Sequence, residues 1–240
     1  MATFISQTPM PAEIEKGVAL WKRKQLSSLI MFGVLLFLGA GTLNWPQGWL
    51  YLGLHALTIA AQMALVLPRS PALLAERSRL QAGTKRWDVV MSIIGLGFGS
   101  LALLLVAGLD YRNGWTAPLP LWVVALAVVA MIVGWAIIIW AMVSNPFFAA
   151  TVRVQTDRDQ RVITGGPYGY VRHPGYVGAI LYNAATPFIL GSLWALLPAL
   201  VVVLFFIART LGEDPVLQRE LPGYRDYSER VRYRLLPGLW

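Results

Sequence analysis

The chain has 240 residues, of which 57% are hydrophobic and only 13% are charged, and its mean hydropathy is +0.58. Soluble globular proteins carry about 25% charged residues, so most of this chain is expected to lie in a lipid bilayer. It contains no cysteine and two histidines. This excludes disulfides, thiolate metal sites, a cysteine nucleophile and a membrane di-iron site built from several histidines. Any chemistry must therefore come from a few polar residues.

Six apolar runs predict about six membrane-spanning helices, because a bilayer core about 30 Å thick needs roughly 20 apolar residues per helix. The first four runs carry no charged side chain. The last two are separated only by Gly191 and Ser192, which predicts a tight helical hairpin. The expected fold class is all-α, a polytopic transmembrane bundle with a C-terminal hairpin. The runs are residues 26–43, 49–67, 89–109, 121–143, 174–190 and 193–211.

Positive charge predicts the orientation of these spans. Every Lys and Arg except Arg112 falls before the first span, between the second and third, between the fourth and fifth, or at and after the end of the sixth. Because Lys and Arg are retained on the cytoplasmic side, both termini are expected to be cytoplasmic, as in a multi-pass protein of the bacterial inner membrane. The net charge of +8 is then explained by topology and contacts with anionic membrane lipids, not by nucleic-acid binding. No signal peptide is expected.

Polar residues concentrate in the stretch GGPYGYVRHPGY, residues 165–176. Pro174 suits the first turn of a helix, which places Arg172 and His173 at the cytosolic mouth of the fifth span. Free backbone N–H groups and the helix dipole favour anionic ligand groups there. Tyr176 is expected inside the first turn. The other histidine, His55, has no His, Asp or Glu on its helix face and is expected to be a hydrogen-bonded packing residue, not a ligand.

The predicted hairpin returns the sixth span to the same membrane face, so its acidic end should meet this stretch. A purely structural role for the acidic end would be an ion pair between Arg209 and Glu213, which are spaced i, i+4 on the helix. Cationic, anionic and aromatic groups side by side would suit a zwitterionic ligand with a flat ring. The residues expected to converge are Arg172, His173, Tyr176, Glu213 and Asp214.

Two stretches carry a family resemblance: GPYGYVRHPGYVGAI at 166–180 and ARTLGEDPVLQRELPGYRDY at 208–227. The order of a G-P-Y-x-x-x-R-H-P-x-Y motif, a helical hairpin, R-x-x-x-E-E and Y-x-x-Y resembles the isoprenylcysteine carboxyl methyltransferase family and its phospholipid N-methyltransferase relatives. The resemblance covers roughly residues 145–240. It implies a cytosolic pocket for S-adenosyl-L-methionine and a lipophilic acceptor that enters from the membrane. Residues 1–143 would then be a four-span membrane region and 144–240 the catalytic region.

The resemblance also implies residue roles. Arg172 would pair with the methionine carboxylate or an acceptor carboxylate, and Glu213 would meet the methionine ammonium or a ribose hydroxyl; these two are the implied catalytic residues. Asp214 replaces the usual second Glu, and residues 221–223 depart from the family's Phe-Gly turn. No metal is implied. The implied cofactor-binding residues are Gly166, Pro167, Tyr168, His173, Tyr176, Glu213, Asp214, Tyr224 and Tyr227.

Two other interpretations stay open. The ending YSERVRYRLLPGLW, residues 227–240, also resembles the tail of membrane sterol reductases that use NADPH, although Gly175 and Ala179 depart from that family's motif and a G-x-G-x-x-G fingerprint is absent from the sequence. A non-enzymatic carrier is disfavoured because the spans show no charge near a midpoint and no inverted repeat.

The acceptor itself stays undetermined between a prenylated protein C-terminus, a phospholipid amine, and an isoprenoid or fatty acid. Several residues near the cytosolic end of the fourth span are candidates for lining its path, with simple packing as the alternative. These residues are Trp135, Trp140, Asn145, Phe147 and Phe148.

Overall fold

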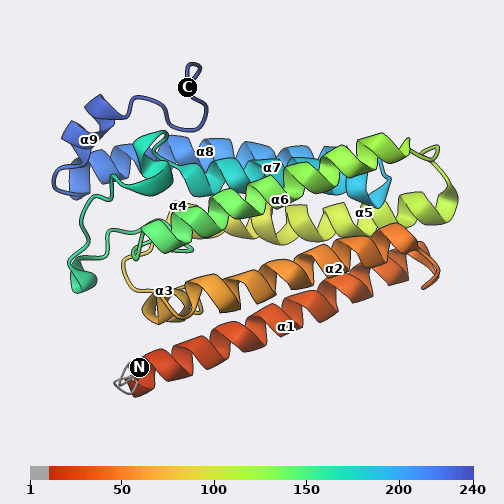
Figure 1. Ribbon diagram of the computed structural model, residues 1–240, viewed down its shortest axis with the longest axis horizontal. Coiled ribbons are helices and arrows are strands. Elements are labelled where there is room, and N and C mark those ends of the chain that lie inside the picture. Colours follow the sequence, from red (N-terminus) through yellow and green to blue (C-terminus); the bar gives the residue numbers. More distant parts are fainter. Residues whose placement is uncertain (1–10) are drawn as a thin grey trace, which may run out of the picture.

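The computed structural model describes residues 11–240, and all regular structure in this range is helical (Figure 1). The predicted all-α class is confirmed. Two of the helices continue into short π-helical segments, Gln62–Val66 and Ile93–Gly99, and two 3-10 turns cover Thr156–Arg158 and Gly166–Gly169. The α-helices are α1 Ala12–Ala40, α2 Pro46–Ala61, α3 Pro71–Glu76, α4 Arg86–Ser92, α5 Ser100–Asn113, α6 Leu121–Ser144, α7 Pro174–Leu190, α8 Leu196–Glu220 and α9 Tyr224–Arg230.

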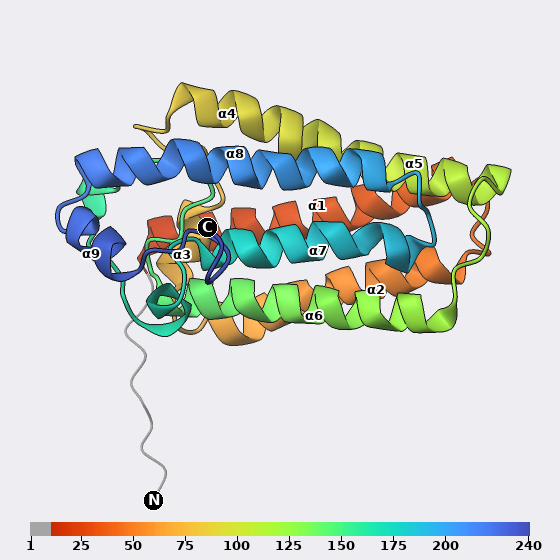
Figure 2. The same ribbon diagram turned by 90° about the horizontal axis from the view of Figure 1, so that it is seen from above.

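Five helices are long and apolar enough to cross a membrane: α1, α2 with its π segment, the continuous helix from α4 to α5, α6 and α8. The chain is therefore a multi-pass membrane protein. The remaining predicted span, α7, has 17 residues, or about 26 Å of helix, and falls just short of that length. Figure 2 shows it between α6 and α8. The expected six spans thus become five long helices and one shorter helix packed among them.

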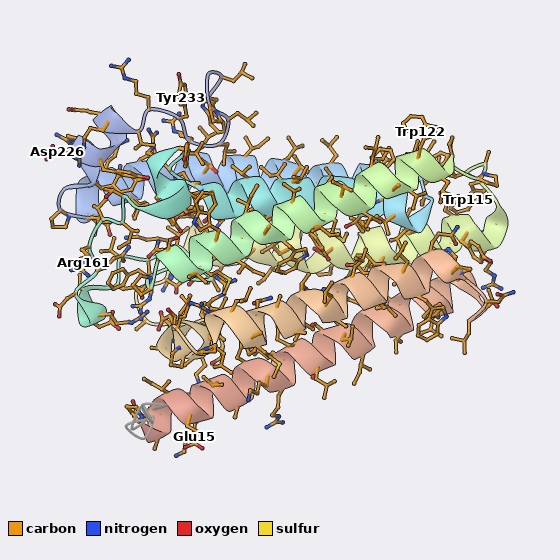
Figure 3. All side chains as sticks on the ribbon, in the orientation of Figure 1. Glu15, Trp115, Trp122, Arg161, Asp226 and Tyr233 are labelled. Carbon is orange, nitrogen blue, oxygen red and sulfur yellow. The ribbon has the colours of Figure 1, made fainter. Side chains whose placement is uncertain are left out.

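The long helices lie side by side, with the connecting segments gathered at the two ends of the bundle (Figures 1 and 2). The start of α1, α3 and α9 share one end. The loop from α5 to α6 and the turn from α7 to α8 share the other. In Figure 3, Arg161 and Asp226 mark the first end and Trp115 and Trp122 mark the second. The orientation predicted from positive charge would make the first end the cytosolic one.

Two helices extend well beyond the predicted apolar runs. α1 begins at Ala12 instead of residue 26, and α8 ends at Glu220 instead of residue 211. Hydrophobicity marks only the part of a helix that lies in lipid, whereas backbone hydrogen bonding continues into water until the sequence interrupts it. For α8 the interruption is Leu221, whose extended conformation is the one favoured before a proline such as Pro222.

Glycines bring α6 and α7 into close contact. A Cβ on Gly134 would lie 2.7 Å from the Gly178 carbonyl oxygen, and a Cβ on Gly178 would collide with the Gly134 carbonyl oxygen in turn. Small residues at such crossings let helix backbones approach in a membrane. This contact fixes the start of α7 beside the end of α6, which is where the polar segment 145–173 begins and ends.

The turn from α7 to α8 is longer than the two residues predicted. Gly191 caps α7 in the left-handed conformation, with φ of 72°, and α8 does not begin until Leu196. The Ser192 hydroxyl donates to buried Asp110 at 2.5 Å, and Asp110 also accepts bonds from the backbone N–H and hydroxyl of Thr116 at 2.7 and 2.6 Å. Asp110 thus links the loop from α5 to α6 with the turn from α7 to α8.

Candidate active site

A cavity lies where α6 ends, α7 begins and α8 ends. The segment after α6, the 3-10 turn Gly166–Gly169, the first turn of α7, the end of α8 and α9 all contribute to its wall. Its free volume is about 90 Å³. The lining includes Asn145, Phe147, Phe148, Arg153, Arg161, Tyr168, Arg172, His173, Tyr176, Glu213, Tyr224 and Tyr227.

Proline and glycine set the local backbone around this cavity. Pro174 occupies the first turn of α7, as predicted, with His173 as the preceding cap residue. Gly166 has φ of 61°, and a Cβ there would lie 3.1 Å from Trp140 Nε1 and collide with the Ser144 hydroxyl. Only glycine therefore lets the 3-10 turn pack against the end of α6.

Asp214 is the centre of the buried polar network, with a side chain that is 0% exposed. Arg172 binds both of its oxygens, Nε to Oδ1 at 2.9 Å and Nη2 to Oδ2 at 2.8 Å. Tyr224 donates to it at 2.9 Å, and burial together with this carboxylate raises the pKa of Tyr224, so the phenol stays protonated. Arg234 Nε lies 3.1 Å and His173 Nε2 3.3 Å from its oxygens. Asp214 itself does not line the cavity.

Arg172 is occupied by the protein itself. Beyond Asp214, its Nη1 donates to the carbonyl oxygens of Val231 and Arg232, both at 2.9 Å. The backbone N–H of Arg172 donates to the Tyr233 carbonyl at 2.9 Å, and that of His173 to the Arg234 carbonyl at 3.0 Å. The sequence led us to expect free N–H groups at these positions, and this expectation was wrong because the C-terminal tail folds back onto them.

Glu213, the neighbour of Asp214, is placed very differently. It is half-buried, lines the cavity and accepts a hydrogen bond from the Tyr176 hydroxyl. The expected Arg209–Glu213 pair is not formed; Arg209 instead pairs with Asp88 of α4, with Nε and Oδ1 2.9 Å apart. Within residues 11–240 no ion pair involves Glu213, so its carboxylate faces the cavity without a cationic partner.

Aromatic rings form much of the remaining wall. His173 stacks on Tyr176, with ring centres 5.4 Å apart and planes inclined by 6°. The Tyr227 hydroxyl donates to the Tyr168 carbonyl at 2.7 Å. In the part of the chain that the structure describes, the buried Tyr168 hydroxyl has no hydrogen-bond partner. Buried polar groups are rarely left unpaired, so we propose this hydroxyl, which lies near Asn145 of the cavity wall, as a group that a ligand could bind.

The residues predicted for the site thus fall into two groups. The predicted convergence at the ends of α7 and α8 is observed, but only part of the set reaches the cavity. Those that line it are Tyr168, Arg172, His173, Tyr176, Glu213, Tyr224 and Tyr227. Those that lie next to the lining residues but do not themselves line the cavity are Gly166, Pro167 and Asp214.

Sequence reasoning missed several residues that line or support the cavity. Arg153 and Arg161 lie on its wall, but from the sequence we counted them only among the positive charges that predict membrane orientation. Asp88, one residue before the predicted third span, is buried and holds Arg209. The only available signal was the position of Asp88, an acid directly at the start of an otherwise uncharged span.

An apolar groove of about 480 Å³ lies beside the cavity, between α2 and α6. Of the residues considered for an acceptor path, Trp135 and Trp140 line this groove, whereas Asn145, Phe147 and Phe148 line the polar cavity. The groove lies along the C-terminal half of α6, from Met131 to Val143, and Arg69 lies at the Val143 end. The other groove residues are Leu54, Leu57, Thr58, Ala61, Leu65, Ile132, Ala136 and Ile139.

Fold and site define a polytopic helical membrane protein with a polar cavity at one end of its bundle. Residues 122–222 match the phospholipid methyltransferase family. A stretch of 93 residues is 34% identical to the protein-S-isoprenylcysteine O-methyltransferase of Schizosaccharomyces pombe, covering 38% of each chain. This part of the chain is therefore similar to membrane methyltransferases, and the family resemblance predicted from the motifs is confirmed for residues 122–222.

A second relative is the Delta(14)-sterol reductase of Mus musculus, which is 30% identical over 102 residues, or 40% of this chain and 24% of the mouse protein. In both comparisons the match spans well under two thirds of the relative. The family match begins at residue 122, in α6, one helix earlier than the resemblance that the motifs predicted.

Proposed function

We propose that the protein transfers a methyl group from S-adenosyl-L-methionine to a lipophilic acceptor held in the membrane. The single observation that carries this proposal is Glu213, a half-buried carboxylate without a cationic partner in the wall of an aromatic cavity. A carboxylate beside aromatic faces suits an ammonium or sulfonium ligand. The family match of residues 122–222 supports the same reaction type.

The groups on the cavity wall fit this cofactor chemically. Glu213 would bind the amino group or a ribose hydroxyl, the Tyr168 hydroxyl would pair with a further polar group, and His173 and Tyr176 offer stacked rings. Exposed Arg161 is a candidate partner for the methionine carboxylate of the cofactor, because Arg172 is already bonded to Asp214 and to carbonyl groups of the tail. A free volume of about 90 Å³ is small beside typical ligand sites, so we expect residues 160–163 to move outward on binding.

S-Adenosylmethionine supplies a methyl group already activated as a sulfonium, so the protein needs no strong nucleophile. The chain's task is to align donor and acceptor in line and to exclude water. Asp214 and Arg172 keep the ends of α7, α8 and the tail in fixed relation, which holds the wall rigid. A carboxylate acceptor needs no base, whereas an amine acceptor requires a proton acceptor, for which His173 and Glu213 are the candidates on the wall.

We assign the acceptor's hydrocarbon chain to the groove between α2 and α6. The groove is almost wholly apolar and runs from Met131 to Val143, about 18 Å of helix, which is close to half of a bilayer core about 30 Å thick. Asn145 begins the cavity wall two residues after Val143. An acceptor in the cytosolic leaflet would thereby present its head group to the cavity.

The same proposal covers topology and domains. Both termini would be cytoplasmic, in a bacterial inner membrane, with residues 144–240 as the catalytic region and residues 1–143 as the membrane region that holds the acceptor. Asp110 closes the opposite end of the bundle with Ser192 and Thr116, which supports an enzyme over a carrier.

The match to a sterol reductase supports a second candidate, an NADPH-dependent reduction. Gly175 and Ala179 depart from that family's motif, and a Cβ on Gly175 would collide with the Phe148 ring of the cavity wall. Tryptophan fluorescence quenching by NADPH, with and without S-adenosylhomocysteine, separates the two candidates.

The test of the proposed function is ligand binding by the purified protein. S-Adenosylhomocysteine should bind the wild type with micromolar-scale affinity, and Glu213→Ala should lose that affinity because the free carboxylate is removed. Calorimetric titration in detergent measures both. A wild type that fails to bind this ligand would overturn the proposal.

A further inference from the structure

The cavity depends on a residue outside the family-matched segment. Asp88 lies in the first turn of α4, at the cytosolic start of the third span, and its side chain is 0% exposed. Arg209 of α8, only 4% exposed, binds it with Nε 2.9 Å from Oδ1 and with Nη2 3.1 Å from Oδ2. A carboxylate from the N-terminal half thus neutralises a guanidinium in the C-terminal half.

Arg209 links this ion pair to the cavity. Its guanidinium carbon lies 5.4 Å from the centre of the Tyr176 ring, and the Tyr176 hydroxyl donates to Glu213. Glu213 follows Arg209 at i, i+4 on α8, the spacing at which the two side chains would otherwise pair. Because Asp88 holds Arg209, the Glu213 carboxylate remains open to the cavity.

The charge balance at this wall depends on the same contact. Asp88 and Glu213 are acidic and Arg209 is basic, so these three groups together carry one net negative charge, while the nearby Arg77 is held by the carbonyl oxygens of Phe148 and Ala149. If Asp88 were neutral, that net charge would vanish, and Arg209 would be left buried without a counterion next to Glu213. A buried charge without a partner is strongly unfavourable, so Arg209 would turn to Glu213.

Asp88 and Arg209 also hold the backbone of the cavity wall. The Val152 N–H donates to Asp88 Oδ2 at 2.7 Å, and Arg209 Nη2 donates to the Ala150 carbonyl at 2.8 Å. Thr151, between these two residues, lines the cavity. The ion pair therefore fixes both the wall and the charge that faces the ligand.

We infer that Asp88 is a positioning residue of the ligand site: by holding Arg209, it keeps Glu213 free to bind the cationic group of the methyl donor. This inference rests on the proposed function. It places an essential part of the site in the third span, within the region that the sequence assigns only to membrane packing.

The experiment titrates S-adenosylhomocysteine into the purified full-length chain, as wild type, as Asp88→Asn and as the double variant Asp88→Asn/Arg209→Met. Asp88→Asn should bind at least about tenfold more weakly, as expected for loss of a charge-assisted contact. The double variant should recover most of the affinity, because it removes the guanidinium that would capture Glu213. A residue that merely supports the fold would show no such recovery.

The matched control is Asp110→Asn, the same change at a buried aspartate at the other end of the bundle, which should lower the melting temperature and leave affinity unchanged. Wild-type affinity in Asp88→Asn, or equally weak binding in the double variant, would overturn the inference while the proposed function stands. If Asp88→Asn does not fold, the affinity of the double variant alone tests the inference. The double variant is expected to fold, because buried ion pairs often tolerate apolar replacement. A wild type that does not bind would instead overturn the proposed function.

Discussion

Two neighbouring acids at the end of α8 perform different tasks. Asp214 is 0% exposed and is surrounded by donors from Arg172, Tyr224 and Arg234, whereas half-buried Glu213 meets the cavity. Adjacent residues on a helix point about 100° apart, so one can face the protein while the other faces the ligand. The shorter acid at 214 is bound by these donors, and the longer one at 213 is the acid that we propose for ligand recognition.

Asp214→Asn should therefore act on stability. The change leaves the Arg172 guanidinium buried beside a neutral amide, at a cost of about 3–5 kcal/mol, the range for breaking a buried ion pair. Thermal unfolding in detergent should show a clear drop in melting temperature. Asp226→Asn, at an exposed position of α9, is the control and should leave it unchanged; equal melting temperatures for the two variants would contradict the network described for Asp214.

At this scale the sequence predicted which residues meet but not how they pair. The motif spacing correctly brought Arg172 and His173 to the acidic end of α8. It could not tell whether Arg209 would bind Glu213, one turn away, or Asp88, far away in the chain. That choice depends on how α4 packs against α8, for which local sequence carries no signal.

At the scale of elements, the groove between α2 and α6 is the place that we propose for the acceptor chain. Ala136 lines it, whereas Val133, on the same helix, is exposed outside it. Ala136→Trp should fill the groove and lower kcat/KM for lipid acceptors about tenfold or more, as expected for overpacking, while S-adenosylhomocysteine binding stays intact.

Val133→Trp adds the same side chain to the lipid-facing side of α6 and serves as the control. Methylation of a membrane lipid extract with a labelled methyl donor, followed by mass spectrometry, measures both variants. Equal labelling by the two would show that the acceptor chain lies elsewhere.

The apolar runs predicted the spans well, because lipid imposes a simple length requirement. They did not predict the π-helical segment Ile93–Gly99, where a Cβ on Gly99 would lie 2.9 Å from Val202 of α8. Such a segment arises from the fit between two helices, and hydrophobicity along one helix does not encode that fit.

At the scale of the whole molecule, the chain's lack of cysteine allows a direct test of topology. Asn113, the last residue of α5, and Arg225, in α9, are both exposed and can each be replaced by a single cysteine. In intact cells a membrane-impermeant maleimide should label Asn113→Cys. The same reagent should label Arg225→Cys only after the cells are permeabilised. The unmodified chain provides the blank, and the reverse pattern would contradict the orientation derived from positive charge.

The fold-back of the C-terminal tail has a consequence for how the protein is made. The carbonyl groups of Val231, Arg232, Tyr233 and Arg234 complete the contacts of Arg172 and His173, yet these residues follow every membrane span in the order of synthesis. The cavity wall therefore reaches its final form only after the last helix has entered the bilayer. During biosynthesis, membrane insertion of the helices therefore precedes completion of the cavity wall.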